Sequence, residues 1–267
     1  YIFRRNFTGV EFEMSSQEAD ISGQTDDRVS MIWGAENGDS NFVLAASILD
    51  RSAMSGADFN PSLAQLGISG LGTSFLLFGP STVDSGPYAG TYSPFQNVPS
   101  PTCVADQGIL IPQASGSRCG FVYGPRFNVV NDEDHTSMYG SFKTLLANGN
   151  GLEIDYMSTA IDVNDNPQSP SYPALSYLSP SNAIMPGTGG NPFGVPVLWL
   201  GRALGSAYPS PNAPREIETD RFSIGLNGEF NNGFDWDAHY TVSSEDLYGQ
   251  QPDTSTSKFS AAIKGNG

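Results

Sequence analysis

Apolar and polar side chains alternate over many segments of this chain, and that alternation limits its fold more than any other feature. In residues 221–230, Phe222, Ile224, Leu226 and Phe230 occupy alternate positions, with mostly polar residues between them. A period of two residues is typical of a β-strand with one apolar face. The pattern resumes in residues 234–243 after Asn231-Asn232-Gly233, so the two segments predict a β-hairpin.

The same unit recurs along the chain. Residues 28–35 and 41–49 flank Asn37-Gly38-Asp39, and residues 138–146 and 152–156 flank a turn at 148–151. Residues 10–14 suggest an opening strand, and Phe259, Ala261 and Ile263 suggest a closing strand. We therefore expect an all-β fold of about eight antiparallel strands.

The connections between these strands are very unequal. Residues 51–136 and 163–218 form long stretches rich in Pro, Gly and Ser, and shorter stretches at 16–27 and 245–255 fall at the same end of the hairpins. Structureless connections of more than about 12 to 15 residues are uncommon in compact domains. Outer-membrane barrels combine short periplasmic turns with long extracellular loops. The asymmetry therefore favours a transmembrane β-barrel over a sandwich, with apolar faces toward lipid and polar faces toward the lumen.

Charge and hydropathy exclude two other classes of protein. The 28 acidic and 12 basic side chains give a net charge of −16, whereas a nucleic-acid partner requires a basic face. No run of 18 apolar residues is present to form a membrane helix. We expect no nucleic-acid partner, and any membrane crossing must use strands.

The two cysteines, Cys103 and Cys119, close a ring of 17 residues in a Gly-, Ser- and Pro-rich segment. A disulfide is the natural interpretation, and it implies an oxidising compartment. Two unpaired thiols are the alternative.

Several segments resemble one known family. In chain order they are similar to a first barrel strand, a first complete hairpin, a cysteine-bridged extracellular loop, an acidic lead into a strand, a loop signature, and a strand-turn-strand unit. These segments are Phe7–Phe12, Arg28–Arg51, Cys103–Tyr123, Asn131–Ser137, Asn191–Gly194 and Arg215–Ser244. Together they resemble the first part of the β-barrel of TonB-dependent receptors of Gram-negative outer membranes.

The resemblance implies a fold, a location and a function. Residues 1–267 would be part of a 22-stranded barrel with a plugged lumen, without the plug domain itself. The protein would lie in the outer membrane and import a scarce nutrient such as a siderophore, cobalamin or a carbohydrate. Its partners would be outer-membrane lipid, the nutrient, and the TonB complex acting through the plug. Asp235, Asp237, Glu153 and Asp155 would face the lumen.

Aromatic residues in the long connections are the candidate ligand-binding groups, because aromatic rings stack on sugars and on aromatic siderophores. Packing of the loops onto one another is the alternative role for each residue. The candidates are Tyr88, Tyr92, Phe95, Trp199 and Tyr208, together with Tyr172 and Tyr177.

A weaker hypothesis concerns calcium. Asp162, Asn164 and Asp165 lie in a stretch that resembles the calcium linker of cadherin repeats, and oxygen ligands suit calcium. A polar strand exit explains the same residues, so no metal site is our main expectation. A secreted all-β module that binds glycans or calcium remains the alternative function.

Catalytic patterns are weak. The two histidines, His135 and His239, have no zinc-site spacing, and Gly67–Gly72 matches neither a nucleophile elbow nor a phosphate loop, which favours a flexible loop there. We expect neither enzymatic activity nor a cofactor.

Overall fold

The computed structural model describes residues 7–168, 180–202 and 207–266. The chain divides into two compact units. Unit 1 comprises Tyr1–Met54, Val129–Asn166 and Ala213–Gln250, and unit 2 comprises Ser55–Asn128, Pro167–Asn212 and Gln251–Gly267. The two long connections thus supply most of unit 2, while the alternating segments supply unit 1.

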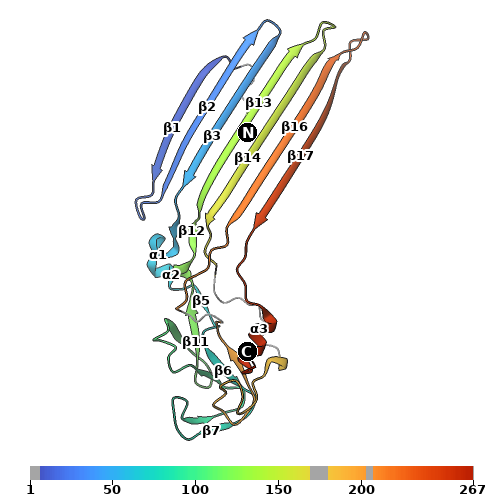
Figure 1. Ribbon diagram of the computed structural model, residues 1–267. Helices are drawn as coiled ribbons and strands as arrows, with labels where there is room; N and C mark the ends of the chain where they lie inside the picture. The colour runs from blue at the N-terminus through green and yellow to red at the C-terminus, as the bar shows by residue number, and fades with distance from the viewer. Residues whose placement is uncertain (1–6, 169–179, 203–206, 267) are drawn as a thin grey trace. The chain divides into compact units, whose positions relative to one another are not determined.

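Within the described residues, unit 1 is a single antiparallel sheet of seven strands that follow one another in chain order (Figure 1). β1 and β17 lie at its two edges, and these described strands do not close into a barrel. The expected antiparallel all-β class is confirmed. The strands are β1 (Gly9–Glu18), β2 (Thr25–Asn37), β3 (Ser40–Arg51), β13 (Asp132–Leu145), β14 (Gly151–Asp165), β16 (Arg215–Glu229) and β17 (Asp235–Gly249).

Strand register places the apolar positions of all seven strands on one side of the sheet. Trp33 pairs with Leu44, and Phe222 pairs with both Tyr156 and Val242. Directly paired residues of antiparallel strands point to the same face. We call the side that carries these residues the apolar face and the opposite side the polar face. The faces expected from alternation in the sequence match this register.

Short turns join the strands at one end of the sheet, which we call the turn side. Gly38 between β2 and β3, Gly149 between β13 and β14, and Gly233 between β16 and β17 have φ values of 59°, 84° and 80°. Residues with a side chain rarely adopt this left-handed conformation, so the Asn/Gly-rich turns of the sequence suit these positions. The long connections leave the sheet at its other end, which we call the loop side.

The expected eighth strand is wrong. Phe259, Ala261 and Ile263 belong to helix α3 (Thr256–Ile263). Phe259 and Ile263 are four residues apart, so a helix brings them to one face. The Phe259 ring lies 5.5 Å from that of Trp199, and Ile263 packs against the core of unit 2. Alternation over five residues that include alanines does not distinguish a strand from a short helix.

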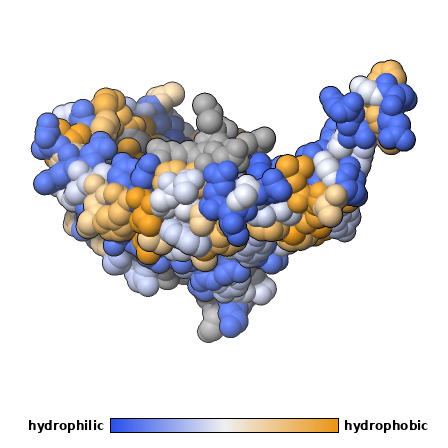
Figure 2. Space-filling model, turned by 90° about the horizontal axis from the view of Figure 1, so that it is seen from above, coloured by the Kyte–Doolittle hydropathy of each residue, from blue (hydrophilic) through white to orange (hydrophobic). Residues whose placement is uncertain are grey.

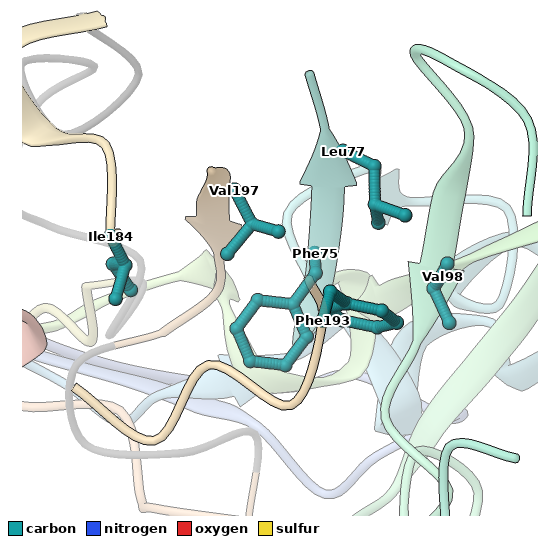
Figure 3. Close-up of a cluster of buried hydrophobic side chains, with 6 residues drawn as sticks. All are labelled: Phe75, Leu77, Val98, Ile184, Phe193 and Val197. Atoms are coloured by element: carbon teal, nitrogen blue, oxygen red, sulfur yellow. The ribbon is translucent and has the colours of Figure 1, made fainter. Parts of the chain in front are cut away.

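The long connections that make up unit 2 are not structureless, because they fold around a hydrophobic core of their own. Its strands β6 (Ser74–Leu77) and β15 (Val197–Leu200) are far apart in the sequence but pair with each other, and β6 also pairs with β9 (Asn97–Pro99). Six buried side chains, labelled in Figure 3, form the core between them. Short helices and strands fill the rest of the long connections: β4 (Met54–Ser55), α1 (Gly56–Phe59), α2 (Pro61–Ala64), β5 (Ile68–Ser69), β6 (Ser74–Leu77), β7 (Ser81–Val83), β8 (Gly90–Tyr92), β9 (Asn97–Pro99), β10 (Gly108–Pro112), β11 (Ser117–Val122), η1 (Gly124–Arg126), β12 (Asn128–Val130), η3 (Pro180–Asn182) and β15 (Val197–Leu200).

Two sequence features of unit 2 have a local explanation. Gly67–Gly72, expected to be a flexible loop, contains β5, which pairs with β11. Asn191 orders the segment before β15, because its amide donates to the carbonyls of Ile184 and Val195 and its oxygen accepts from the Phe193 N–H.

No helix in the described part of the chain is long and apolar enough to cross a membrane.

Candidate functional site

The apolar face of unit 1 is open to the surroundings. Val10, Phe12 and Met14 on β1 are 61 to 69% exposed, and large apolar side chains on the other strands are exposed as well. Figure 2 shows hydrophobic residues gathered along the outer side of the curved sheet. A contiguous apolar surface of this extent marks a protein or membrane contact. Its other exposed members are Val29, Met31, Trp33, Leu44, Ile48, Met138, Tyr156, Phe222, Leu226, Tyr240 and Val242.

Acidic side chains limit the apolar surface on the loop side. On β3 the limit falls between Ile48 and Asp50, and the row of paired residues that contains Asp50 also contains Asp27, Asp134 and Asp162. Burial of an unpaired carboxylate in an apolar environment costs much free energy, so this row of four aspartates must be in contact with water. On β2, β3, β13 and β14 the exposed apolar surface therefore does not extend past this row.

The apolar surface runs obliquely to the rows on the remaining strands. Ile48 on β3 belongs to the apolar run of that strand, but the residue of β16 in the same row is Glu218. The apolar run of β16 begins four residues closer to the turn side, at Phe222. At the turn side the difference is reversed. The apolar run on β3 has already ended at Ser40, but in the same row of paired residues β16 still carries an apolar residue, Leu226. The boundary thus shifts four residues toward the turn side between β2 and β17. This is about 13 Å along the strands over about 24 Å of sheet width, a slant of about 30°.

Aromatic side chains gather on the apolar face near the turn side. The rings of Trp33 and Phe42 lie 5.7 Å apart, and those of Phe230 and Trp236 lie 6.1 Å apart. Phe234, in the adjacent turn, is 68% exposed. Such rings suit the boundary between apolar and aqueous phases.

The polar face is hollowed. A depression of about 730 Å³ is lined by residues of six strands, from β1 to β16, and its charged members are Glu11, Glu13 and Arg221. Ser30, Ser47, Ser137, Tyr139 and Thr159 supply hydroxyl groups to the same lining. Ile32, Val43 and Met157 also line the depression, so its wall mixes charged, hydroxyl and apolar side chains.

The residues expected to face the lumen lie on the polar face. Glu153 forms a 2.7 Å ion pair with Lys143, and Asp155 accepts a 2.8 Å hydrogen bond from the Tyr139 hydroxyl. Asp235 and Asp237 occupy alternate positions of β17, opposite Glu229 and Asn227. Glu153 and Asp155 thus have polar partners within the sheet itself.

The expected ligand-binding aromatics take different positions in unit 2. Tyr88, Tyr92 and Trp199 pack against the core, and the Tyr92 ring lies 5.4 Å from that of Phe193. Phe95 and Tyr208 are exposed. Tyr172 and Tyr177 lie outside the described residues. The structure therefore does not gather the five candidates into one site.

A second hollow, of about 370 Å³, lies in unit 2 beside two of these aromatics. Tyr88 and Tyr92 line it together with Gln96, Asn97 and several prolines. Burial raises the pKa of the Tyr88 phenol, because the charged form loses solvation there. Sequence reasoning did not find the two amides, since Gln and Asn in a Pro- and Gly-rich stretch have no distinctive spacing.

The disulfide is formed. Cys103 and Cys119 have Cα atoms 5.9 Å apart, and both residues are almost fully buried. The bond ties the segment before β10 to β11, so it stabilises the same part of unit 2 that contains the hollow.

The weak calcium candidates Asp162, Asn164 and Asp165 lie at the C-terminal end of β14. Asn164 donates its amide to Asp134 at 2.8 Å, and Asp162 pairs across the sheet with the same aspartate. In the described part of the chain, no three His, Cys, Asp or Glu side chains are grouped to hold a metal ion. His135 and His239 contact Glu133 and Asp237 on the polar face, at 3.1 and 3.6 Å.

No protein-family model, curated protein or solved structure matches this chain. The surfaces and contacts within each unit are therefore the basis for any functional conclusion.

Proposed function

We propose that the protein is an outer-membrane β-barrel receptor of the TonB-dependent kind, which imports a scarce nutrient, and that unit 1 is part of its barrel wall. The observation that carries this proposal is the exposed apolar face, which is continuous over seven strands and opposed by a face whose depression carries the charged side chains Glu11, Glu13 and Arg221. Transmembrane barrels have this combination of apolar exterior and polar interior.

The dimensions of the apolar surface support the proposal. On β16 the apolar run from Phe222 to Phe230 covers about 26 Å of strand, or about 20 to 23 Å when tilted by 30 to 40°, and on β3 the run from Phe42 to Ile48 covers about 20 Å. The apolar band of outer-membrane barrels is about 25 Å tall. The slant of about 30° agrees with strand tilt, because a horizontal lipid layer crosses tilted strands at different residues.

The open edges of the sheet also favour a larger barrel. Among the described strands, β1 and β17 each have a neighbour on one side only, and N–H and C=O groups left unpaired along their outer edges would cost several kcal/mol each in lipid. Further strands that close the barrel remove this cost. Under the proposal the turn side faces the periplasm, and unit 2 is built from the extracellular connections.

Nitroxide scanning tests the proposal. Single cysteines at positions 41–50 of β3 are labelled in the chain reconstituted in phosphatidylcholine vesicles, with the native disulfide intact. Positions 42, 44, 46 and 48 should be accessible to oxygen dissolved in lipid, and positions 43, 45 and 47 to a water-soluble nickel relaxant. A chain that stays monomeric in water without lipid or detergent, with no alternation in either signal, would refute the proposal and favour the secreted binding module.

A further inference from the structure

Asn–Gly pairs recur in this chain, and such pairs are prone to a covalent change. Asn is a thermally labile residue, because the backbone nitrogen of the next residue can attack its side-chain amide carbon. A following glycine hinders this attack least, since it has no side chain. Of the five pairs that lie wholly within the described residues, two have their glycine in a paired strand, Gly151 in β14 and Gly228 in β16. The other three lie in the tight turns on the turn side: Asn37-Gly38, Asn148-Gly149 and Asn232-Gly233.

Exposure and backbone conformation do not distinguish these three turns. All three asparagines and all three glycines are exposed, so water reaches each turn. Each glycine also has a positive φ, at 59°, 84° and 80° in chain order. Any difference in reactivity must therefore come from their contacts.

The glycine N–H groups make different hydrogen bonds. The Gly149 N–H donates to the Leu146 carbonyl at 2.8 Å, and the Gly233 N–H donates to the Phe230 carbonyl at 2.8 Å. Within the described residues no group accepts from the Gly38 N–H. A bonded N–H holds its nitrogen and its proton in place, so the hydrogen bond opposes attack at Gly149 and Gly233 but not at Gly38.

The asparagine side chains differ in the same way. The Asn148 Oδ1 atom accepts from the Asn150 N–H at 3.1 Å, and the Asn232 Oδ1 atom accepts from the Phe234 N–H at 3.4 Å. The Asn37 side chain has no hydrogen-bond partner in the part of the chain that the structure describes. Neither reacting group of the Asn37-Gly38 pair is therefore restrained by a hydrogen bond.

We infer that Asn37 is a site of spontaneous deamidation, and that it reacts faster than the other asparagines of the turn side. The Gly38 nitrogen attacks the Asn37 Cγ atom, and the new N–Cγ bond closes a five-membered succinimide ring. The Cγ–Nδ2 bond breaks, and the proton of the Gly38 N–H leaves with the amide nitrogen as ammonia. Water then opens the ring at either of its carbonyl groups, which gives aspartate or isoaspartate.

The change would alter the turn that sets the register of β2 and β3. Only Gly38 and Asp39 separate the two strands, and Asn37 pairs with Ser40 to close the turn. Isoaspartate adds one methylene group to the backbone at this closing pair. The turn also contacts β13, because the Asp39 carbonyl accepts from the Leu145 N–H at 3.0 Å. Deamidation therefore modifies a point where three strands meet. The inference does not rest on the proposed function.

Peptide mapping by mass spectrometry tests the inference on the whole folded chain, incubated in detergent micelles at mildly alkaline pH. Deamidation raises the mass of a peptide by about one dalton, and isoaspartate separates from aspartate by chromatography. Asn37 should convert about tenfold faster or more than Asn148 and Asn232, because the hydrogen bonds of those two turns must break first. Circular dichroism checks that the strands are formed.

The same chain in urea, with the disulfide reduced, is the matched control. Unfolding removes the turn hydrogen bonds, so the three asparagines should convert at rates within about threefold of one another. Asn37→Gln should abolish modification of this turn and leave Asn148 and Asn232 unaffected, because glutamine would have to form a larger ring. The inference is overturned if Asn148 or Asn232 converts as fast as Asn37 in the folded chain, or if the preference for Asn37 persists unchanged in urea.

Discussion

Two arginine substitutions in one row of paired residues distinguish a slanted membrane band from an ordinary apolar surface. Leu226 on β16 and Ser40 on β3 share a row and both lie on the apolar face. Leu226 is four residues from each end of the apolar run Phe222–Phe230, so it lies near the middle of the band, whereas Ser40 lies at the end of the run on β3. We expect Leu226→Arg to reduce the free energy of insertion by about 2 to 4 kcal/mol and Ser40→Arg by about 0 to 1 kcal/mol.

The assay is transfer of the chain from urea solution into phosphatidylcholine vesicles, with the inserted fraction separated by flotation as urea is varied. Ala45→Arg is the control for the opposite face, because this residue lines the polar hollow, and we expect it to cost about 1 kcal/mol or less. Equal effects of Leu226→Arg and Ser40→Arg would contradict the slanted band. Changes within about 0.5 kcal/mol for all three variants would indicate that the apolar face lies in water.

Further predictions concern single contacts. Trp236→Arg should lower insertion by only about 0 to 1 kcal/mol in the same flotation assay, because Trp236 pairs with Gly228 near the turn side, and a loss of 3 kcal/mol would place it at midplane instead. Reduction of Cys103–Cys119 should destabilise unit 2 by about 3 kcal/mol in guanidinium unfolding, as expected for a 17-residue ring, and the double serine variant should be insensitive to reductant. Gly108→Ala should cost about 1 to 3 kcal/mol in thermal unfolding, since its Cβ would lie 2.7 Å from the Cys119 Sγ atom, and an unchanged melting temperature would contradict the observed packing. The pKa of Tyr88 is raised by burial, so its contribution to stability is complete below about pH 10 and is lost as the pH rises through the folded-state pKa; wild type should therefore lose more stability above pH 10 than Tyr88→Phe does.

Sequence reasoning succeeded where a strand is specified by its own residues and its nearest turn. The hairpin around Asn231-Asn232-Gly233 is specified in this way, because alternation determines which residues share a face and the turn determines the register. α3 shows the limit of the method, because Phe259 and Ile263 satisfy a helix as well as a strand, and only their contacts in unit 2 distinguish the two. Local pattern therefore predicts long strands reliably and short terminal segments poorly.

Unit 2 could not be predicted in the same way, because its pairings are far apart along the chain. Leu77 pairs with Val197, and Phe75 with Trp199, across more than a hundred residues rich in Gly, Pro and Ser. Strands of two to six residues are too short to show a period, and their partners are not adjacent in sequence. The disulfide was the one long-range contact in this unit that residue type alone indicated.

The same difference explains why the two candidate surfaces were not equally visible in the sequence. A membrane-facing surface repeats one simple requirement at every second residue, so Leu44, Leu226 and their neighbours disclose it strand by strand. A binding hollow depends on the placement of a few side chains by a nonlocal core, and Asn97 acquires its position only because the Phe95–Gln96 backbone bonds to β6. The two surfaces thus differ in how they are specified: the apolar face by residues two apart along each strand, and the hollow by contacts between segments that are not adjacent in the sequence.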